Sequence, residues 1–518
     1  MPANSTHQDY DANIVAWQRA RDVFAGEDAV KAAAEKYLPR LDCQDDTDYL
    51  AYKNRASFFN ASARTADGFV GLIFRRDPTF KLPDASNGIS AALTEFVEDA
   101  DMLGTSLSAF SKKLVTEIIN VGRAGTLIDW NEEAEQRAYA VAYTAEDIIN
   151  WHTERVNGRN VLTLLVLKEI CRKPADEADP FVPEEIQQLR VLKLVPPQGT
   201  ADNAKADWSY QVEIWQLLSE NENPNGTRSR GKKKWKLTDT ITPLRLGKPL
   251  PLIPFVFHGP RHSLPEIDKI PLADIIAVNL DHYRLNADYK HGMHFTALPT
   301  AWVSGFDKAS TLRIGSSTAW VAETPGATAG FLEFHGQGLS TFERAMDRDE
   351  QLMAVLGTRM LESRKRVGET AAAIELRQSG ENSILNTVSL SISSSLTQVL
   401  RWVYWWNSTE HFPDDIGPDL VLATLNTDFS ITGMSALEIT ALVAAWQAGA
   451  ISQSTMLDLF RAGEVIAPGR TNEEEINLLA TQKPPTAPVG PSGRAPAPAP
   501  AIPPTVPGDV NAKPVTAN

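Results

Sequence analysis

The sequence predicts an α+β protein in which helical and strand-rich stretches follow one another in long blocks. Apolar residues recur at helical spacing up to about residue 130, and short strand-like runs follow between about 125 and 257. A strand-and-turn module then lies between two helical stretches, and a third, longer helical stretch comes after them. We therefore expect helices and sheets in separate blocks of one large protein.

The first block contains several predicted helices. One opens at Tyr49 to Asn60 and is expected to end near Pro78, because proline disfavours helical backbone in the residue before it. Another covers residues 107–121, with Gly122 as the residue that ends it.

The second block consists of short apolar runs bounded by turn residues. This pattern predicts a small mixed or antiparallel sheet. The predicted strands are 126–130, 160–167, 189–194, 210–215, 235–240 and 253–257.

The region after the sheet predicts helix, β module, helix, loop and long helix. The first helix covers 272–291 with Gly292 as its stop, and the β module covers 299–334. Ser340 and Glu343 form a capping-box pattern that predicts the start of the second helix. The long helix is predicted from about Asn382 to Trp406, roughly 37 Å at 1.5 Å per residue.

The C-terminal part predicts short helices and then a tail. Ser435 and Ser452 are expected N-caps, with Gly449 and Gly463 as the corresponding stops, and Thr471 with Glu474 is a capping box. Residues 483–518 are about one-third proline, which predicts a disordered or polyproline-like tail.

Composition limits the class of protein. The chain has 518 residues and a formal net charge of −15, so it does not bind nucleic acid through a generally basic surface. Its only cysteines, Cys43 and Cys171, form neither a disulfide framework nor a zinc motif, which favours a reducing compartment. The beginning lacks the pattern of a signal peptide, and no apolar run reaches the roughly 18 residues of a membrane span.

Catalytic motifs are absent or weak. The sequence has no Walker A loop, no HExxH and no GxSxG. Asp347 and Asp349 could hold a metal for a nuclease, although mixed charges on a helix usually form a solvated face. Several histidines gather in one third of the chain at spacings that fit no zinc pattern, namely His258, His262, His282, His291, His294 and His335. We expect no metal, no cofactor and no catalysis.

Three clusters could contact nucleic acid. The basic run 228–236 either touches phosphate or, as we favour, forms a solvated hairpin loop. Arg364, Lys365 and Arg366 either complement the helix dipole or contact a moving ligand, and both alternatives stay open. Trp402, Trp405 and Trp406 could stack on bases, but packing in a core or a subunit interface is favoured.

A further set of short stretches, in order along the chain, carries a resemblance to a known family. They are 37–40, 52–56 with 59–60, 71–78, 122–129, 143–151, 253–256, 279–283 with 287–288, 449–452 and 472–475. Between about residues 11 and 480 the chain resembles the portal proteins of tailed bacteriophages, and in particular a portal-like subfamily formerly labelled as of unknown function. The long Pro-rich tail departs from the family pattern.

The resemblance implies a portal architecture with wing, stem, clip and crown. The implied division is a helical wing region (1–130), a β-rich wing region (131–270), a stem helix (271–293), the clip (294–336), a second stem helix (337–362), a tunnel loop (363–381), the long wing helix with a β segment (382–430), a helical crown (431–482) and the tail (483–518).

The resemblance also implies a role in the virion. Twelve copies would form a ring at one capsid vertex, after assembly in the host cytoplasm, and double-stranded DNA would pass through it during packaging and ejection. The implied partners are the terminase large subunit, the major capsid and scaffolding proteins and a head–tail adaptor, with no membrane. Alternatives are another head–tail connector ring or a metal-dependent nuclease or hydrolase.

Two site hypotheses follow from the implied architecture. Twelve chains sum to 12 × −15 = −180, so an acidic channel would repel phosphate while Arg364, Lys365 and Arg366 of the tunnel loop contact the DNA backbone. If alanine at all three positions left the length and retention of packaged DNA unchanged, these residues would not be the DNA contacts. The clip is expected to bind its partner near Arg313, Trp320 and Phe331, unless these residues fill the module's own core.

Overall fold

The computed structural model divides into two compact units, Met1–Phe429 and Ser430–Asn518, which are described separately. The residues that the structure describes are 3–84, 88–131, 136–156, 158–176, 179–196, 208–219, 233–297, 300–306, 325–332, 338–357, 371–410, 412–427, 429, 436–462, 465–466 and 471–481. The Pro-rich tail lies outside them.

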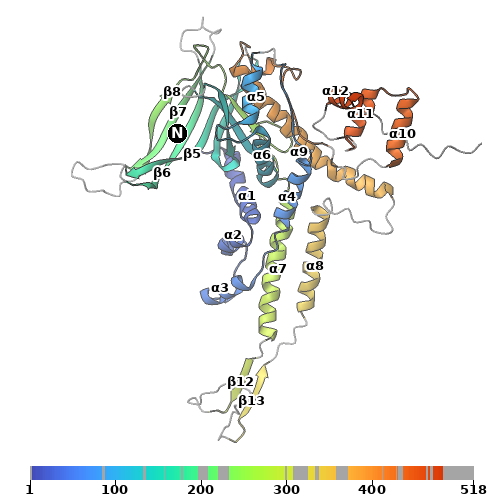
Figure 1. The fold of residues 1–518 in the computed structure, drawn as a ribbon. Coiled ribbons are helices and arrows are strands. Elements are labelled where there is room, and N and C mark those ends of the chain that lie inside the picture. The colour runs from blue at the N-terminus through green and yellow to red at the C-terminus, as the bar shows by residue number, and fades with distance from the viewer. Residues whose placement is uncertain are drawn as a thin grey trace, which may run out of the picture. The chain divides into compact units, whose positions relative to one another are not determined.

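The first unit begins with helices (Figure 1). They are α1 (Gln8–Ala25), α2 (Glu27–Ala32), η1 (Ala34–Lys36), α3 (Asp46–Arg55), α4 (Ala61–Ile73), α5 (Ser90–Glu98) and α6 (Leu107–Val121), with strand β1 (Thr79–Lys81) before α5. The prediction for α6 is confirmed, since Gly122 ends it with φ of +83°.

The single helix predicted from Tyr49 is wrong. The chain forms two helices, because Ala56 takes an extended backbone (ψ 149°) and ends α3. Asn60 then caps α4, with its side-chain oxygen accepting from Ala63 N at 3.0 Å.

Two antiparallel sheets follow. The smaller has the order β11 (Phe255–His258), β2 (Ala124–Trp130) and β3 (Ala138–Thr144). The larger has the order β4 (Ile148–Val156), β5 (Arg159–Asp176), β6 (Asp179–Val195), β7 (Ser209–Ser219) and β8 (Lys233–Ile241). The short turn η2 (Ala145–Asp147) joins the two sheets, and a small hairpin, β9 (Leu244–Arg245) with β10 (Lys248–Pro249), follows β8. Antiparallel pairing was among the predicted alternatives; β3 and β4 were not predicted as strands.

The rest of the first unit contains the helix–hairpin–helix region. Its elements are α7 (Ala273–Ala297), β12 (Thr300–Ser304), β13 (Thr328–Leu332), α8 (Leu339–Leu356), α9 (Ala371–Trp406), η5 (Pro413–Asp415) and β14 (Leu422–Thr424). Strand β14 pairs with β1 from the start of the chain.

Three predicted boundaries in this region are wrong. Helix α7 continues through Gly292, where the small residue allows close approach: a Cβ there would lie 3.0 Å from Leu339 of α8. Helix α8 begins one residue before Ser340, with Gly338 as N-cap, so Ser340 lies in its first turn. Helix α9 begins at Ala371, and the second half of the predicted tunnel loop (363–381) is therefore helical.

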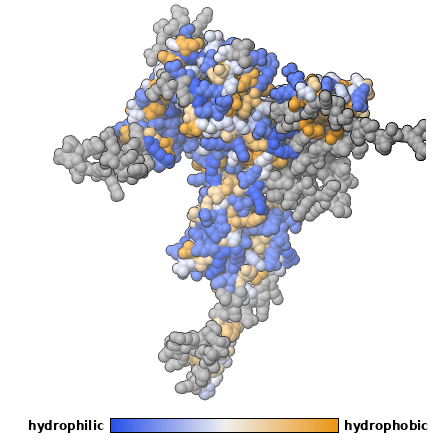
Figure 2. Space-filling model, in the orientation of Figure 1, coloured by the Kyte–Doolittle hydropathy of each residue, from blue (hydrophilic) through white to orange (hydrophobic). Residues whose placement is uncertain are grey.

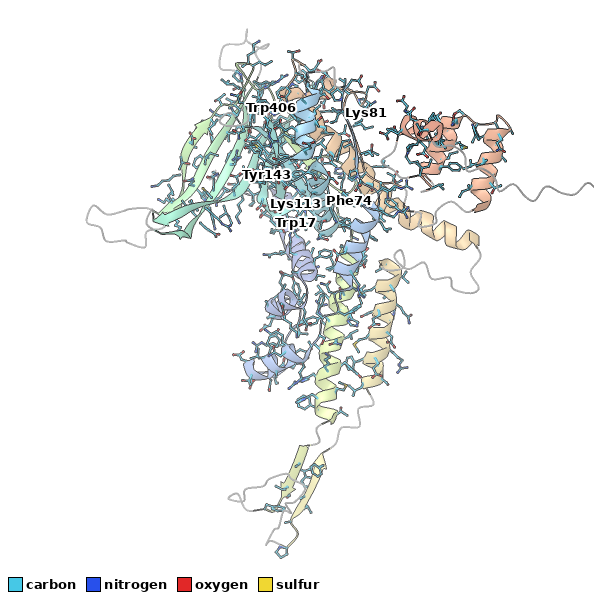
Figure 3. All side chains as sticks on the ribbon, in the orientation of Figure 1. Trp17, Phe74, Lys81, Lys113, Tyr143 and Trp406 are labelled. Atoms are coloured by element: carbon cyan, nitrogen blue, oxygen red, sulfur yellow. The ribbon has the colours of Figure 1, made fainter. Side chains whose placement is uncertain are left out.

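The main core surrounds α9. Its C-terminal half is buried on almost all sides by the smaller sheet, β14 and α5, and Trp402, Trp405 and Trp406 are at most 6% exposed. Figure 3 places Trp406 and Tyr143 within this body and Trp17 at α1. Trp406 stacks on Trp130 at 5.7 Å, so the tryptophans serve packing, as favoured from the sequence.

The second unit contains three short helices, α10 (Ala436–Gln447), α11 (Gln453–Ala462) and α12 (Asn472–Thr481). Two predicted caps are confirmed. Ser452 Oγ accepts from Thr455 N at 3.1 Å, and the Thr471–Glu474 capping box forms with bonds of 3.0 and 3.2 Å. The expected Ser435 and Gly463 lie outside the described residues.

Candidate functional site

Helix α7 is fixed to the N-terminal helices by an apolar contact. Ile276, Leu280, Tyr283 and Ala287 are at most 3% exposed and pack in a second core with residues of α1, α2 and α3. These positions recur at three- and four-residue spacing, so they form one face of the helix. The face supplies the hydrophobic stabilisation that holds α7 in place.

A buried asparagine fixes the register between α7 and α4. Asn279 is fully buried, and its Oδ1 accepts from the backbone N (3.1 Å) and Oγ (2.9 Å) of Ser62. Its Nδ2 donates to the carbonyl of Phe59 at 2.6 Å. Because a buried amide is costly unless bonded, this arrangement favours a single register.

The far half of α7 contacts α3 through polar groups. Tyr52 donates to Asp288 Oδ1 at 2.5 Å, and burial together with this carboxylate raises the pKa of Tyr52. His291 Nδ1 lies 3.2 Å from Arg55 Nη1. Partial burial and then the Arg55 charge lower the pKa of His291, so this histidine is held neutral.

Helix α8 runs antiparallel to α7 and contacts it through polar groups and half-buried apolar residues. Tyr289 donates to Glu343 at 2.7 Å near the hairpin end. At the other end Gly357 allows a close approach, since a Cβ there would lie 2.6 Å from Thr65 and 2.7 Å from Ile275. Only Asp349 and Met353 of α8 are buried, whereas Leu352, Val355 and Leu356 are 39–46% exposed. Figure 2 shows a mainly hydrophilic surface around these two helices.

A small polar cluster lies on the inner side of α8. His282 of α7 is 4% exposed, and its Nε2 lies 3.5 Å from Glu350 Oε1. Asp349 is 8% exposed, and burial followed by the Asp281 charge raises its pKa. Within the described part of the chain, His282 Nδ1 and Asp349 Oδ2 have no hydrogen-bond partner.

The hairpin between the helices presents one aromatic residue on each face. Trp302 pairs with Gly330, and Ala301 pairs with Phe331. Neighbouring residues of a strand point to opposite faces, so Trp302 and Phe331 lie on different faces, 46% and 55% exposed. Phe331 therefore fills no core within its own chain as described. The other two predicted clip residues, Arg313 and Trp320, lie outside the described residues.

The remaining predicted DNA-contacting and metal residues are placed as follows. Arg364, Lys365 and Arg366 lie outside the described residues, as do His335 and the first part of the basic run, 228–232. The second part of that run, Lys233 to Lys236, forms the start of strand β8. Asp347 is exposed while Asp349 is buried, so the two do not form a paired carboxylate site. No group of three or more His, Cys, Asp or Glu that could hold a metal occurs within the described ranges.

His258 has a structural position that its sequence context did not indicate. It is fully buried, with Nε2 2.7 Å from Thr126 Oγ1 and Nδ1 2.7 Å from Ser395 Oγ. Burial lowers its pKa to about 3, so the ring is neutral and joins β2, β11 and α9.

Comparisons with known proteins give one family and several solved structures. Residues 271–407, from α7 to the end of α9, match the family described as Domain of unknown function (DUF4055). A search of curated proteins found no match. No helix in the described part of the chain is both long and apolar enough to cross a membrane.

Three of the similar solved structures come from gene transfer agent (GTA) particles. A chain of the native virion has 11% identity and a TM-score of 0.37, with 83% of this chain and 98% of that chain covered. A chain of the empty-particle neck, computed with C6 symmetry, has 11% identity and a TM-score of 0.37, covering 81% and 94%. A chain of the native-particle neck, computed with C12 symmetry, has 10% identity and a TM-score of 0.36, covering 81% and 94%.

Proposed function

We propose that this chain is a portal subunit, one of twelve that form a ring at a capsid vertex of a phage-like particle. In this proposal α7 and α8 are the stem helices, the β12–β13 hairpin belongs to the clip and α9 is the long wing helix. Double-stranded DNA passes through the ring, and the terminase, capsid and scaffolding proteins and a head–tail adaptor dock on it. No bond chemistry is required of the chain.

The observation that carries the proposal is the two-faced hairpin between two antiparallel helices. A two-stranded hairpin is marginally stable alone. This one exposes Trp302 on one face and Phe331 on the other, so its own chain buries neither aromatic fully. A ring supplies a neighbour on each side, and a head-to-tail contact between identical copies joins two different faces. The exposed Leu352, Val355 and Leu356 of α8 offer a second apolar surface for a neighbour.

The hairpin contact is testable by cysteine cross-linking of the full chain. The background carries Cys43→Ser and Cys171→Ser, which removes both native thiols. In this background Trp302→Cys with Phe331→Cys is expected to give a ladder of covalent multimers on mild oxidation. The two side chains lie on opposite faces, so they cannot bond within one hairpin.

The single-cysteine variants are the matched controls. Each has one thiol and cannot extend a chain beyond a covalent dimer. If the double variant also stops at dimers, while still folded, the head-to-tail hairpin contact is wrong.

Arg364, Lys365 and Arg366 stay proposed as DNA contacts. Their replacement by alanine is expected to reduce the length or retention of packaged DNA, because three cations per copy are lost from the channel. Unchanged packaging would show that these three residues are not the DNA contacts, and it would not contradict the proposed ring.

A further inference from the structure

Helix α8 has an unusual inner face. Of its eighteen residues, only Met353 and Asp349 are buried, and one of these two is a carboxylic acid. Asp349 Oδ2 has no hydrogen-bond partner among the described residues, and the same holds for Nδ1 of the buried His282 on α7. A buried ionised carboxylate without a partner is costly, whereas the neutral acid is tolerated and can donate a hydrogen bond.

The charged groups around Asp349 do not offset the cost of burying its carboxylate in the ionised form. Asp281 of α7 opposes ionisation, while His282 of α7 and Arg348 of α8 favour it. Glu350, the next residue on α8, is already bound to His282 Nε2. Near the end of α8 the close contact from α4 is the uncharged Thr65. Burial is the largest effect, and the net result is a raised pKa of Asp349.

The state of this one group matters because Asp349 is one of only two buried residues of α8. Helix α7 has four buried apolar residues against the N-terminal helices, whereas Met353 is the one buried apolar residue of α8, beside the half-buried Leu339, Phe342 and Met346. The other contacts of α8 to α7 include Leu339 against Gly292, Met346 Sδ 3.9 Å from Asn286 Nδ2, and the hydrogen bond from Tyr289 to Glu343. Ionising Asp349 would place an unpaired charge in this small buried set and is therefore expected to weaken the packing of α8 on α7.

We propose that Asp349 is a proton-dependent latch between α7 and α8, in which the neutral acid lets α8 pack on α7 and its ionisation loosens α8. The sign follows from the environment: a carboxyl group that is harder to ionise in the folded chain stabilises the packed state at low pH. That stabilisation is lost as the pH rises through the raised pKa of Asp349. Along the chain, α8 joins the hairpin strand β13 to α9, so the latch controls how firmly this connection is held.

The test is hydrogen exchange of α8 amides in the full chain, corrected for the intrinsic pH dependence of exchange. Asp349→Asn keeps the size of the side chain and removes its charge. We expect exchange across 339–356 to slow by about three- to tenfold at neutral pH. We also expect the variant to lose the loosening that the native chain shows between acidic and neutral pH.

Asp347→Asn is the matched control, because it makes the same change on an exposed position of the same helix. It is expected to leave α8 exchange unchanged. If Asp349→Asn exchanges as fast as the native chain, or if Asp347→Asn slows exchange equally, the latch is wrong.

A second variant keeps the test valid if Asp349→Asn fails to fold. Asp281 is exposed, so Asp281→Asn leaves the core intact and removes the like charge that faces Asp349. Because the pKa of Asp349 falls when this charge is removed, the loosening of α8 is expected to shift to lower pH, and an unshifted profile would overturn the proposal. These contacts lie within one copy, and a neighbour covering the exposed apolar residues of α8 would also slow exchange, so the native chain and the variants are compared in the same assembly state.

Discussion

At the scale of single residues, small hydroxyl side chains on α9 bond the backbone of strand β14 and of Leu425, the residue that follows it. Ser393 Oγ accepts from Leu425 N at 2.9 Å, and Thr397 Oγ1 accepts from Ala423 N at 3.0 Å. The two hydroxyls are four residues apart and therefore lie on the same side of the helix. They satisfy two backbone donors, in and directly after β14, that would otherwise be buried without partners.

Removing these acceptors should destabilise the first unit. Ser393→Ala with Thr397→Val leaves two buried N–H groups unpaired, which costs about 1–3 kcal/mol each. Ser394→Ala is the matched control, because Ser394 is exposed on the same helix. Denaturant unfolding should show a lower midpoint for the double variant only, and equal midpoints would contradict this role.

His258 should make stability pH-dependent. Its folded pKa of about 3 lies below the ordinary value of 6.5, so the unfolded chain binds the additional proton. The contribution of His258 to the free energy of unfolding is complete above about pH 6.5 and falls by about 1.4 kcal/mol per pH unit below it, towards pH 3.

The measurement for His258 is denaturant unfolding over this pH range, compared with His258→Gln. The variant is expected to be less stable at pH 7 but to show a shallower pH dependence. Parallel pH profiles would mean that His258 is not held neutral in the folded chain.

Residue patterns predicted local structure well where the cause is local. Gly122, Ser452 and the Thr471–Glu474 box act as expected, because a cap depends on the nearest few residues. Ser340 fails as a cap, although its pattern is equally good. Asn279, His258 and Gly357 could not be identified as important, because their roles depend on partners far away in the chain.

At the scale of elements, the close approach of α8 to α4 and α7 depends on Gly357. We expect Gly357→Ala to cost about 1–3 kcal/mol, because its Cβ would overlap Thr65 and Ile275. Gly71→Ala in α4 is the control, since a Cβ there meets nothing within 4 Å. Thermal unfolding should separate the two variants, and similar melting temperatures would show that the approach of α8 is not tight.

The type and order of most elements in the second half could be predicted, but their ends could not. Hydrophobic periodicity identified α7, α8 and α9, because it records which side of a helix is buried. Gly292 was taken as a stop and instead provides room for Leu339. The order of the strands in the sheets could not be predicted from the sequence either, because strand pairing depends on contacts across the whole chain.

At the scale of the whole molecule, the acidic balance and the exposed surfaces agree with a chain that works in an assembly. The net charge of −15 disfavours general nucleic-acid binding, while a channel of like charge would let DNA move. The aromatic residues on both faces of the hairpin and the exposed apolar residues of α8 are surfaces that neighbouring copies could bury.

The most direct test of the portal proposal is single-particle electron microscopy of the purified full chain, with the mass of the assembly measured on the same sample. The account predicts a closed ring of twelve copies with a central channel, in which the β12–β13 hairpins of neighbouring copies are in contact. A uniform population of monomers without a channel, both in the purified protein and in mature particles, would contradict it.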